Sequence, residues 1–229
     1  MPDVTVGDKA AYLAAPVGSP GPWPGVVVIH EAFGLNADIR GHADRLAALG
    51  YLALAPDLYG GRSWLRCIRG MFRQLHAGSG PAFDALDGCR GWLAERADCT
   101  GRTGVIGFCI GGGFALLCAP RGTYAAAAVN YGEVPSEAGT VLAGSCPIAA
   151  SYGGRDLMGT AHPERLEAAL TALGVPHDVK VYPSAGHSFM SPKPAPIAPL
   201  TSLARLSYDK EAAEDAWQRI FAFFGTYLR

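Results

Sequence analysis

Short apolar runs of strand type alternate with segments of helical periodicity along most of this sequence. The run GVVVIH at 25–30 is rich in β-branched residues and too short for a helix, so it predicts a buried strand. Segment 36–49 carries its apolar residues on one face and is followed by Gly50, which indicates a helix with a C-terminal stop. Such an alternation constrains the chain to an α/β fold with a mainly parallel, doubly wound sheet.

The remaining segments continue the same order. A short hairpin is expected at the start of the chain. Further strands are predicted at 51–58, directly before Cys109, and at 125–131, 146–152 and 177–183. Helices are predicted at 63–76, 81–96, directly after Cys109, and at 164–173 and 209–227. Residues 191–202 are rich in proline and predict a loop, and no repeat or linker divides the chain, so one domain over 1–229 is expected.

Composition limits the classes of function. The chain has 229 residues, 49% of them hydrophobic, which suits one well-buried core. Its 19 basic and 20 acidic residues are spread along the chain, so nothing in the charge favours nucleic acid or an anionic membrane as a partner. A small-molecule ligand is therefore expected, on a monomer or a small homo-oligomer.

The N-terminal residues, the apolar runs and the cysteines indicate the cellular compartment. Asp3 and Asp8 lie where a signal peptide would carry positive charge, and no apolar run approaches the ~18 residues that span a bilayer. A cytoplasmic protein is expected. The six cysteines form no C-x-x-C pair and no metal-type spacing, so they are interpreted as free thiols, with no metal site predicted.

One cysteine has a special setting. Cys109 lies in the pattern G-x-C-x-G between a predicted strand and a predicted helix, which is typical of a nucleophile elbow. Glycine is needed there because the tight turn brings other backbone close to it. The pattern alone also fits a buried structural cysteine beside a glycine-rich turn, or a phosphate-binding loop.

Chain order favours the nucleophile. An elbow nucleophile requires an acid and then a histidine downstream, and Asp156 and His187 each follow a predicted strand in that order. Taken alone, Asp156 would be interpreted as a helix cap or turn residue, and His187 as a solvated loop histidine. Together with Cys109 they predict a catalytic triad.

The segment HEAFGLN at 30–36 follows the first central strand. In enzymes with a nucleophile elbow, two backbone N–H groups stabilise the oxyanion: one from a loop after an early strand and one from the residue after the nucleophile. Ala32 and Ile110 are the candidates for these donors. Glu31 is unexpected, because a carboxylate near a cysteine nucleophile disfavours the thiolate. The plain alternative is that Glu31 caps the loop or forms a salt bridge.

The motifs HEAFGLN, GFCIGGGFAL, GGRD and AGHSF resemble the dienelactone hydrolase family, also called carboxymethylenebutenolidases, over nearly the whole chain. The resemblance implies an α/β-hydrolase fold and a triad of Cys109, Asp156 and His187. It also implies that Glu31 holds the resting thiol and releases it when substrate arrives. Attack on an ester or lactone would give a thioester that water hydrolyses, with no metal or organic cofactor.

The substrate is less well determined by the sequence. Members of that family that act on dienelactone hold its carboxylate with arginines, one of them in a GHSFxR-like stretch, and here that position is Ser191. The second arginine falls in the region 62–73, where Arg66 is expected to face the pocket unless the arginines there form a solvated face. Phe33 and Met190, beside the motifs, are further candidates for substrate binding. An acyltransferase with the same triad, or a catalytically silent small-molecule binding protein, remains an alternative.

Overall fold

The computed structural model describes residues 3–192 and 208–229, and within them the predicted sheet is present as one eight-stranded sheet. Its strand order is β1-β2-β4-β3-β5-β6-β7-β8. The strands are β1 (Asp3–Val6), β2 (Lys9–Ala14), β3 (Trp23–Ile29), β4 (Leu52–Pro56), β5 (Cys99–Phe108), β6 (Ala126–Asn130), β7 (Ile148–Gly153) and β8 (His177–Tyr182). The pairs from β4 to β8 are parallel, and β1 and β2 form the expected antiparallel hairpin at one edge.

The helices connect these strands as the sequence predicts, with small differences at their ends. They are α1 (Ala37–Ala48), α2 (Trp64–Ala77), α3 (Pro81–Ala94), α4 (Ile110–Cys118), α5 (Ala138–Val141), α6 (His162–Leu173) and α8 (Lys210–Tyr227). The short helix α5 was not expected from the sequence. Most of the proline-rich segment predicted at 191–202 lies outside the described residues. None of the described helices is long and apolar enough to cross a membrane.

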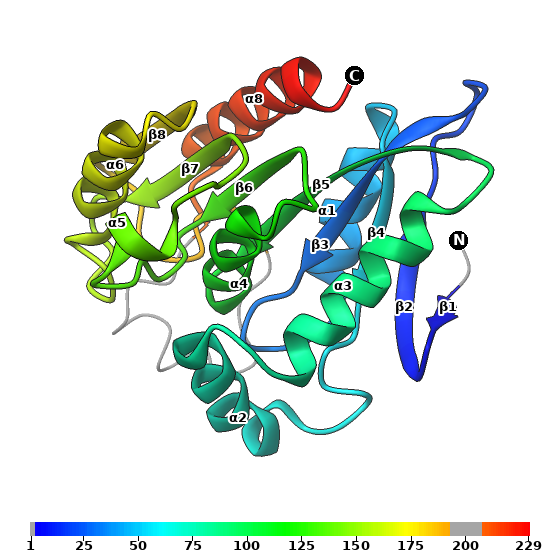
Figure 1. Cartoon of the computed structure of the whole chain (residues 1–229), viewed down its shortest axis with the longest axis horizontal. Helices are drawn as coiled ribbons and strands as arrows, with labels where there is room; N and C mark the ends of the chain where they lie inside the picture. Colours follow the sequence, from blue (N-terminus) through cyan, green and yellow to red (C-terminus); the bar gives the residue numbers. More distant parts are fainter. Residues whose placement is uncertain (1–2, 193–207) are drawn as a thin grey trace.

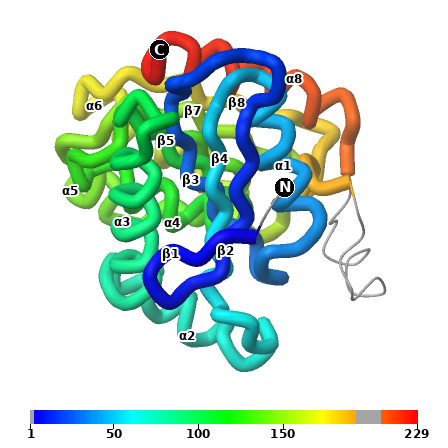
Figure 2. The backbone as a smooth tube through the Cα atoms, turned by 90° about the vertical axis from the view of Figure 1, so that its right-hand side faces the viewer, coloured from blue at the N-terminus to red at the C-terminus, as the bar shows by residue number. Residues whose placement is uncertain are grey.

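The core lies in two layers, one on each face of the sheet. Because side chains alternate along a strand, Val27 and Ile29 join one cluster, with residues of α2, α3, α4 and α6. Val26 and Val28 join the other, with residues of α1 and α8. Figure 2 shows these two layers of helices on opposite sides of the strands. The fold is therefore a single-domain, doubly wound α/β fold.

Helix α2 has a separate position. In Figure 1 it lies beyond the ends of the strands, next to α3 and α4, rather than flat against the sheet. Its buried residues are Met71 and Leu75, and Leu75 contributes to the wall of a cleft at the end of the sheet. In doubly wound folds, ligands bind at the carboxyl ends of the parallel strands. The loops that follow β3, β5, β6, β7 and β8 at this end carry the residues described next.

Candidate active site

Cys109 lies in a strained turn between β5 and α4. Its φ of 55° and ψ of −121° are unfavourable for a residue with a Cβ atom, so the surrounding structure must hold it there. The glycines on either side make this possible: a Cβ on Gly107 would lie 1.9 Å from the carbonyl oxygen of Gly111, and one on Gly111 would lie 2.5 Å from that of Ile29. The Cys109 N–H donates to the Asn130 carbonyl at 3.0 Å, which ties the turn to the end of β6.

Asp156 and His187 meet beside this turn although they are carried by different loops. Asp156 follows β7 and His187 follows β8, and the His187 Nδ1–H donates to Asp156 Oδ2 at 2.7 Å. Both side chains are buried, with 6% and 5% of the His187 and Asp156 side chains exposed. Asp156 Oδ1 accepts from the Met158 N–H at 2.8 Å, so both of its oxygens are engaged.

Electrostatics favour a charged pair at this site. Burial raises the pKa of Asp156, but the hydrogen bond and charge of His187 outweigh that effect and lower it, so Asp156 is ionised. Burial also opposes a charge on His187, yet a thiolate at Cys109 together with Asp156 raises the pKa of His187 to about 10. The other ring nitrogen, Nε2, is buried and has no hydrogen-bond partner among the described residues. It is the nitrogen left to act on the thiol.

His30 shapes the loop that carries Glu31 and Ala32. Its Nδ1 lies 2.7 Å from the Glu31 carbonyl oxygen and donates to it, while its Nε2 accepts from the Leu58 N–H at 3.2 Å. Burial lowers the pKa of His30, so the ring is neutral, and these two bonds define its tautomer. Since both nitrogens are used, His30 positions the loop and is not available as a base.

The Glu31 carboxylate is buried, with 5% of the residue exposed, and two hydroxyl groups hold it by the same oxygen. Tyr131 donates to Glu31 Oε1 at 3.1 Å, and Ser191 donates to it at 2.9 Å. Burial raises the pKa of Glu31, and the hydrogen bonds of Ser191 and Tyr131 and the charge of His187 only partly offset this. Its other oxygen, Oε2, makes no hydrogen bond to a described residue.

The two predicted N–H donors differ in how the structure presents them. Ile110 is the first residue of α4, where an N–H has no carbonyl of its own helix to bond, and Ile110 lines the cleft. Ala32 lies in the loop after β3, and its carbonyl accepts from the Tyr59 hydroxyl at 2.7 Å, which fixes the orientation of the loop.

The cleft itself has a volume of about 130 Å³. Cys109, Ile110, Asp156 and His187 form part of its wall. The other wall residues are Phe72, Leu75, Tyr131, Glu133, Met158, Gly159 and His162. None of the described residues forms a cluster of three or more His, Cys, Asp or Glu able to hold a metal. The arrangement is a small, largely apolar space that opens onto a thiol, a paired imidazole and a helix N-terminus.

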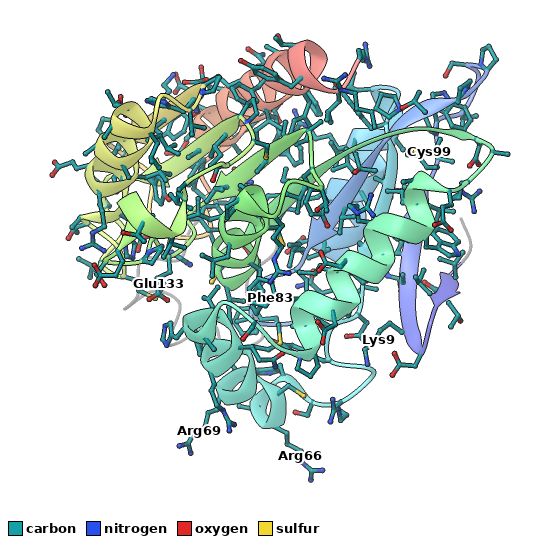
Figure 3. All side chains as sticks on the ribbon, viewed as in Figure 1. Lys9, Arg66, Arg69, Phe83, Cys99 and Glu133 are labelled. Carbon is teal, nitrogen blue, oxygen red and sulfur yellow. The ribbon has the colours of Figure 1, made fainter. Side chains whose placement is uncertain are left out.

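Arg66, predicted to face the pocket, does not do so. Helix α2 turns Met71 and Leu75 inward, and Figure 3 shows Arg66 and Arg69 extending from its outer side into solvent. Arg73 is exposed as well, so the arginines at helical spacing form a solvated face. The prediction failed because the burial of the apolar face fixes the rotation of the helix.

The other three predicted substrate contacts are also directed elsewhere. Ser191 is bonded to Glu31, so its hydroxyl serves that carboxylate. Met190 is 1% exposed and packs in the cluster beneath α8. Phe33 is half-buried, with its ring edge-on to Trp64 at a centroid distance of 5.3 Å. None of the three belongs to the wall of the described cleft.

Sequence reasoning missed Tyr131. It follows β6 directly, has a φ of 42°, holds Glu31 by its hydroxyl, and places its ring 5.1 Å from that of His187. The signal was its position at the carboxyl end of a parallel strand, where site residues gather. An aromatic residue at the end of an apolar run was interpreted as part of the strand instead.

Comparisons with known proteins show the family of this chain. The model of the dienelactone hydrolase family matches residues 10–228. The chain belongs to the dienelactone hydrolase family. A "Putative carboxymethylenebutenolidase" of Yersinia pestis is 32% identical over 230 residues, which cover 93% of this chain and 82% of that relative. A counterpart of the same name in Escherichia coli K12 is 33% identical over 235 residues, covering 95% of this chain and 82% of its own.

Solved structures of the dienelactone hydrolase type have the same fold. The crystal structure of a "Putative Dienelactone Hydrolase" from Klebsiella pneumoniae has a TM-score of 0.76 and 31% identity, and the match covers 96% of this chain and 93% of that one. A dienelactone hydrolase-like promiscuous phosphotriesterase from metagenomic libraries has a TM-score of 0.81 and 25% identity, and the match covers 99% of this chain and 97% of that one. The chain thus has the α/β-hydrolase fold and is an ester or lactone hydrolase of the dienelactone hydrolase type.

Proposed function

We propose that this chain hydrolyses a carboxylic ester or lactone through a thioester formed on Cys109. The observation that carries the proposal is the buried Asp156–His187 pair, joined at 2.7 Å, in the same cleft as a cysteine held at a positive φ. A nucleophile, a base and a group that orients the base are the parts that covalent acyl transfer requires.

The first half of the reaction forms the acyl-enzyme. His187 Nε2 accepts the thiol proton, and Cys109 Sγ attacks the carbonyl carbon of the substrate. The N–H groups of Ala32 and Ile110 stabilise the oxyanion. When the tetrahedral intermediate collapses, the C–O bond breaks and His187 returns the proton to the leaving oxygen, which either departs as an alcohol or stays attached as an opened ring.

The second half releases the acid. Water enters the cleft, His187 removes a proton from it, and the resulting hydroxide attacks the thioester carbonyl. The C–S bond then breaks, the acid leaves, and Cys109 regains its proton. Asp156 keeps the imidazole in the tautomer with its proton on Nδ1 through both halves.

Glu31 is proposed to hold the resting thiol and release it when substrate enters. Its Oε1 is occupied by Tyr131 and Ser191, so Oε2 is the oxygen available for the thiol. Burial, which raises the pKa of Glu31, supports this role, because a carboxylate with a raised pKa exchanges a proton with a thiol more readily than a solvated one.

The test is a hydrolysis screen of the purified protein against p-nitrophenyl acetate, a neutral lactone and a carboxylated enol lactone. Cys109→Ala should lower kcat/KM by several orders of magnitude, as the loss of a triad member does. Cys67→Ala, a half-buried cysteine of α2 outside the cleft wall, is the matched control and should retain activity. A Cys109→Ala enzyme with more than about a tenth of the wild-type kcat/KM would overturn the proposal.

Two product measurements complete the test. Intact-mass analysis after rapid quenching should show one acyl group on wild type and none on Cys109→Ala. Hydrolysis in the presence of an added alcohol should yield free acid as the main product. A dominant transfer product would make the protein an acyltransferase that uses the same thioester.

A further inference from the structure

A second cavity lies directly beside the active-site cleft and shares three of its wall residues, Leu75, Glu133 and His162. Its volume is about 470 Å³, against about 130 Å³ for the cleft. The two spaces are neighbours and both open to solvent, so an elongated molecule with its reacting carbonyl at Cys109 has room to extend past the shared residues.

The wall of this second cavity is mainly apolar. It is formed by the C-terminal part of α2, the loop after β6, and parts of α4, α5 and α6. Its apolar members are Leu75, Ala77, Leu117, Val134, Pro135 and Val141. Such a wall favours methylene groups over a solvated polar chain, because burying them removes apolar surface from water.

One charge in the wall, that of Arg165, has no partner of opposite sign among the described residues. Arg165, on α6, is half-buried and uses one nitrogen to donate to the Val134 carbonyl oxygen at 3.0 Å. Among the described residues no carboxylate forms an ion pair with it. Glu133, the acidic group of the same wall, has both oxygens 3.2 Å from His76 Nε2. The guanidinium therefore keeps free donors in a fork that matches a carboxylate.

His162 stands at the boundary of the two spaces as a neutral donor. Its Nδ1 lies 3.4 Å from the Val134 N–H, which places the ring proton on Nε2. Burial lowers the pKa of His162, so the ring adds no charge at the boundary. The ring packs against Gly159, where an added Cβ would lie 2.2 Å from it, so its orientation is fixed.

We propose that the second cavity binds the distal arm of an elongated substrate, an apolar chain that ends in a carboxylate held by Arg165. The substrate class is a monoester of a linear dicarboxylic acid. The inference rests on the proposed function for its chemistry and adds the substrate class and the residue that selects it.

The kinetic test compares esters of equal chain length that differ in the end group. The carboxylated esters are the p-nitrophenyl monoesters of succinate, adipate and suberate, and the neutral ones are those of butyrate, hexanoate and octanoate. Wild type should prefer the carboxylated member most in the longer pairs, because only an arm that extends past the shared wall residues enters the cavity that holds Arg165. Arg165→Gln should lower that preference about tenfold, in line with the loss of a charge-assisted hydrogen bond.

The controls separate a local contact from a general charge effect. Arg69→Gln removes the same charge from the solvated face of α2 and should keep the preference. Val141, 38% exposed on α5, offers a variant that leaves Arg165 and its bond to Val134 in place. Val141→Asp should abolish the preference by repelling the carboxylate, and Val141→Asn should not. Equal preferences in wild type and Arg165→Gln, or equal effects of Arg165→Gln and Arg69→Gln, would overturn the proposal.

A binding measurement makes the test independent of catalysis. Calorimetry of wild type with suberate and with octanoate should show tighter binding of suberate, and Arg165→Gln should remove the difference. If no ester is hydrolysed but suberate binds through Arg165, the proposed function fails and the subsite stands. If esters are hydrolysed but suberate binds no better than octanoate, only the subsite is refuted.

Discussion

Replacing Ser191 by alanine tests whether its hydroxyl serves Glu31 rather than the substrate. The variant removes a donor that lies 2.9 Å from Glu31 Oε1, in a residue only 8% exposed. A hydrogen bond to a charged group contributes about 1.5–3 kcal/mol, and Tyr131 remains as the second donor, so a loss of about 2 kcal/mol is expected. For a chain of this size that lowers the unfolding midpoint by about 4 to 8 °C.

The dependence on pH identifies the carboxylate as the cause. The hydrogen bond of Ser191 lowers the pKa of Glu31 against the stronger effect of burial, so its removal raises that pKa further. The destabilisation should therefore be largest at a pH where Glu31 is ionised in the wild type, and shrink as the pH falls through the pKa of Glu31 and the carboxyl becomes neutral.

Calorimetric unfolding over a range of pH is the assay. Ser184→Ala is the matched control, because Ser184 Oγ donates to Asp209 Oδ2 at 3.0 Å on the exposed surface, where surface substitutions change stability by only about 0.5 kcal/mol. Equal midpoint shifts in the two variants, or a shift in Ser191→Ala that does not change with pH, would refute the reasoning.

Three further outcomes are expected. A limiting amount of alkylating agent should label Cys109 before Cys118, because burial raises the pKa of the Cys118 thiol to about 12. Peptide mass mapping would identify the labelled residue, and preferential labelling of Cys118 would contradict the expectation. In denaturant unfolding, Gly107→Ala should destabilise the protein by about 3 kcal/mol or more, because the added Cβ would lie 1.9 Å from a backbone oxygen. Gly88→Ala, on the exposed side of α3 with nothing within 4 Å of the added Cβ, should instead stabilise it by about 0.5–1 kcal/mol. By NMR, the pKa of His187 should be lower in Cys109→Ala than in wild type, because a thiolate at Cys109 raises it; an unchanged titration would separate the two residues.

The sequence predicted those parts of the site that depend on short segments at strand ends. Cys109, Asp156 and His187 each follow a strand of the parallel sheet, and parallel strands end at the same edge. The elbow pattern and the order of the three residues along the chain therefore predicted that they share one cleft. The elbow was predictable for a similar reason, because the close approaches at Gly107 and Gly111 are local to the turn.

The parts that failed depend on packing between distant segments. Ser191 and Glu31 are 160 residues apart, and no periodicity or motif relates their side chains. The direction of Arg66 depends on the rotation of α2, which the burial of Met71 and Leu75 decides. Helical spacing alone identifies a face but does not say whether that face turns toward the cleft or toward solvent.

The setting of Glu31 shows why a carboxylate at this position is unfavourable for stability. Burial raises its pKa despite two hydroxyl donors, so the folded state binds a proton more tightly than the unfolded chain does. Its contribution to stability is then fully present below the unfolded pKa and declines as the pH rises through the folded pKa. A glutamine of the same shape would have no ionisable group there and would avoid that loss. The charge of Glu31 is thus a cost to the fold, which favours the proposed role of its ionisation in catalysis over a purely structural cap.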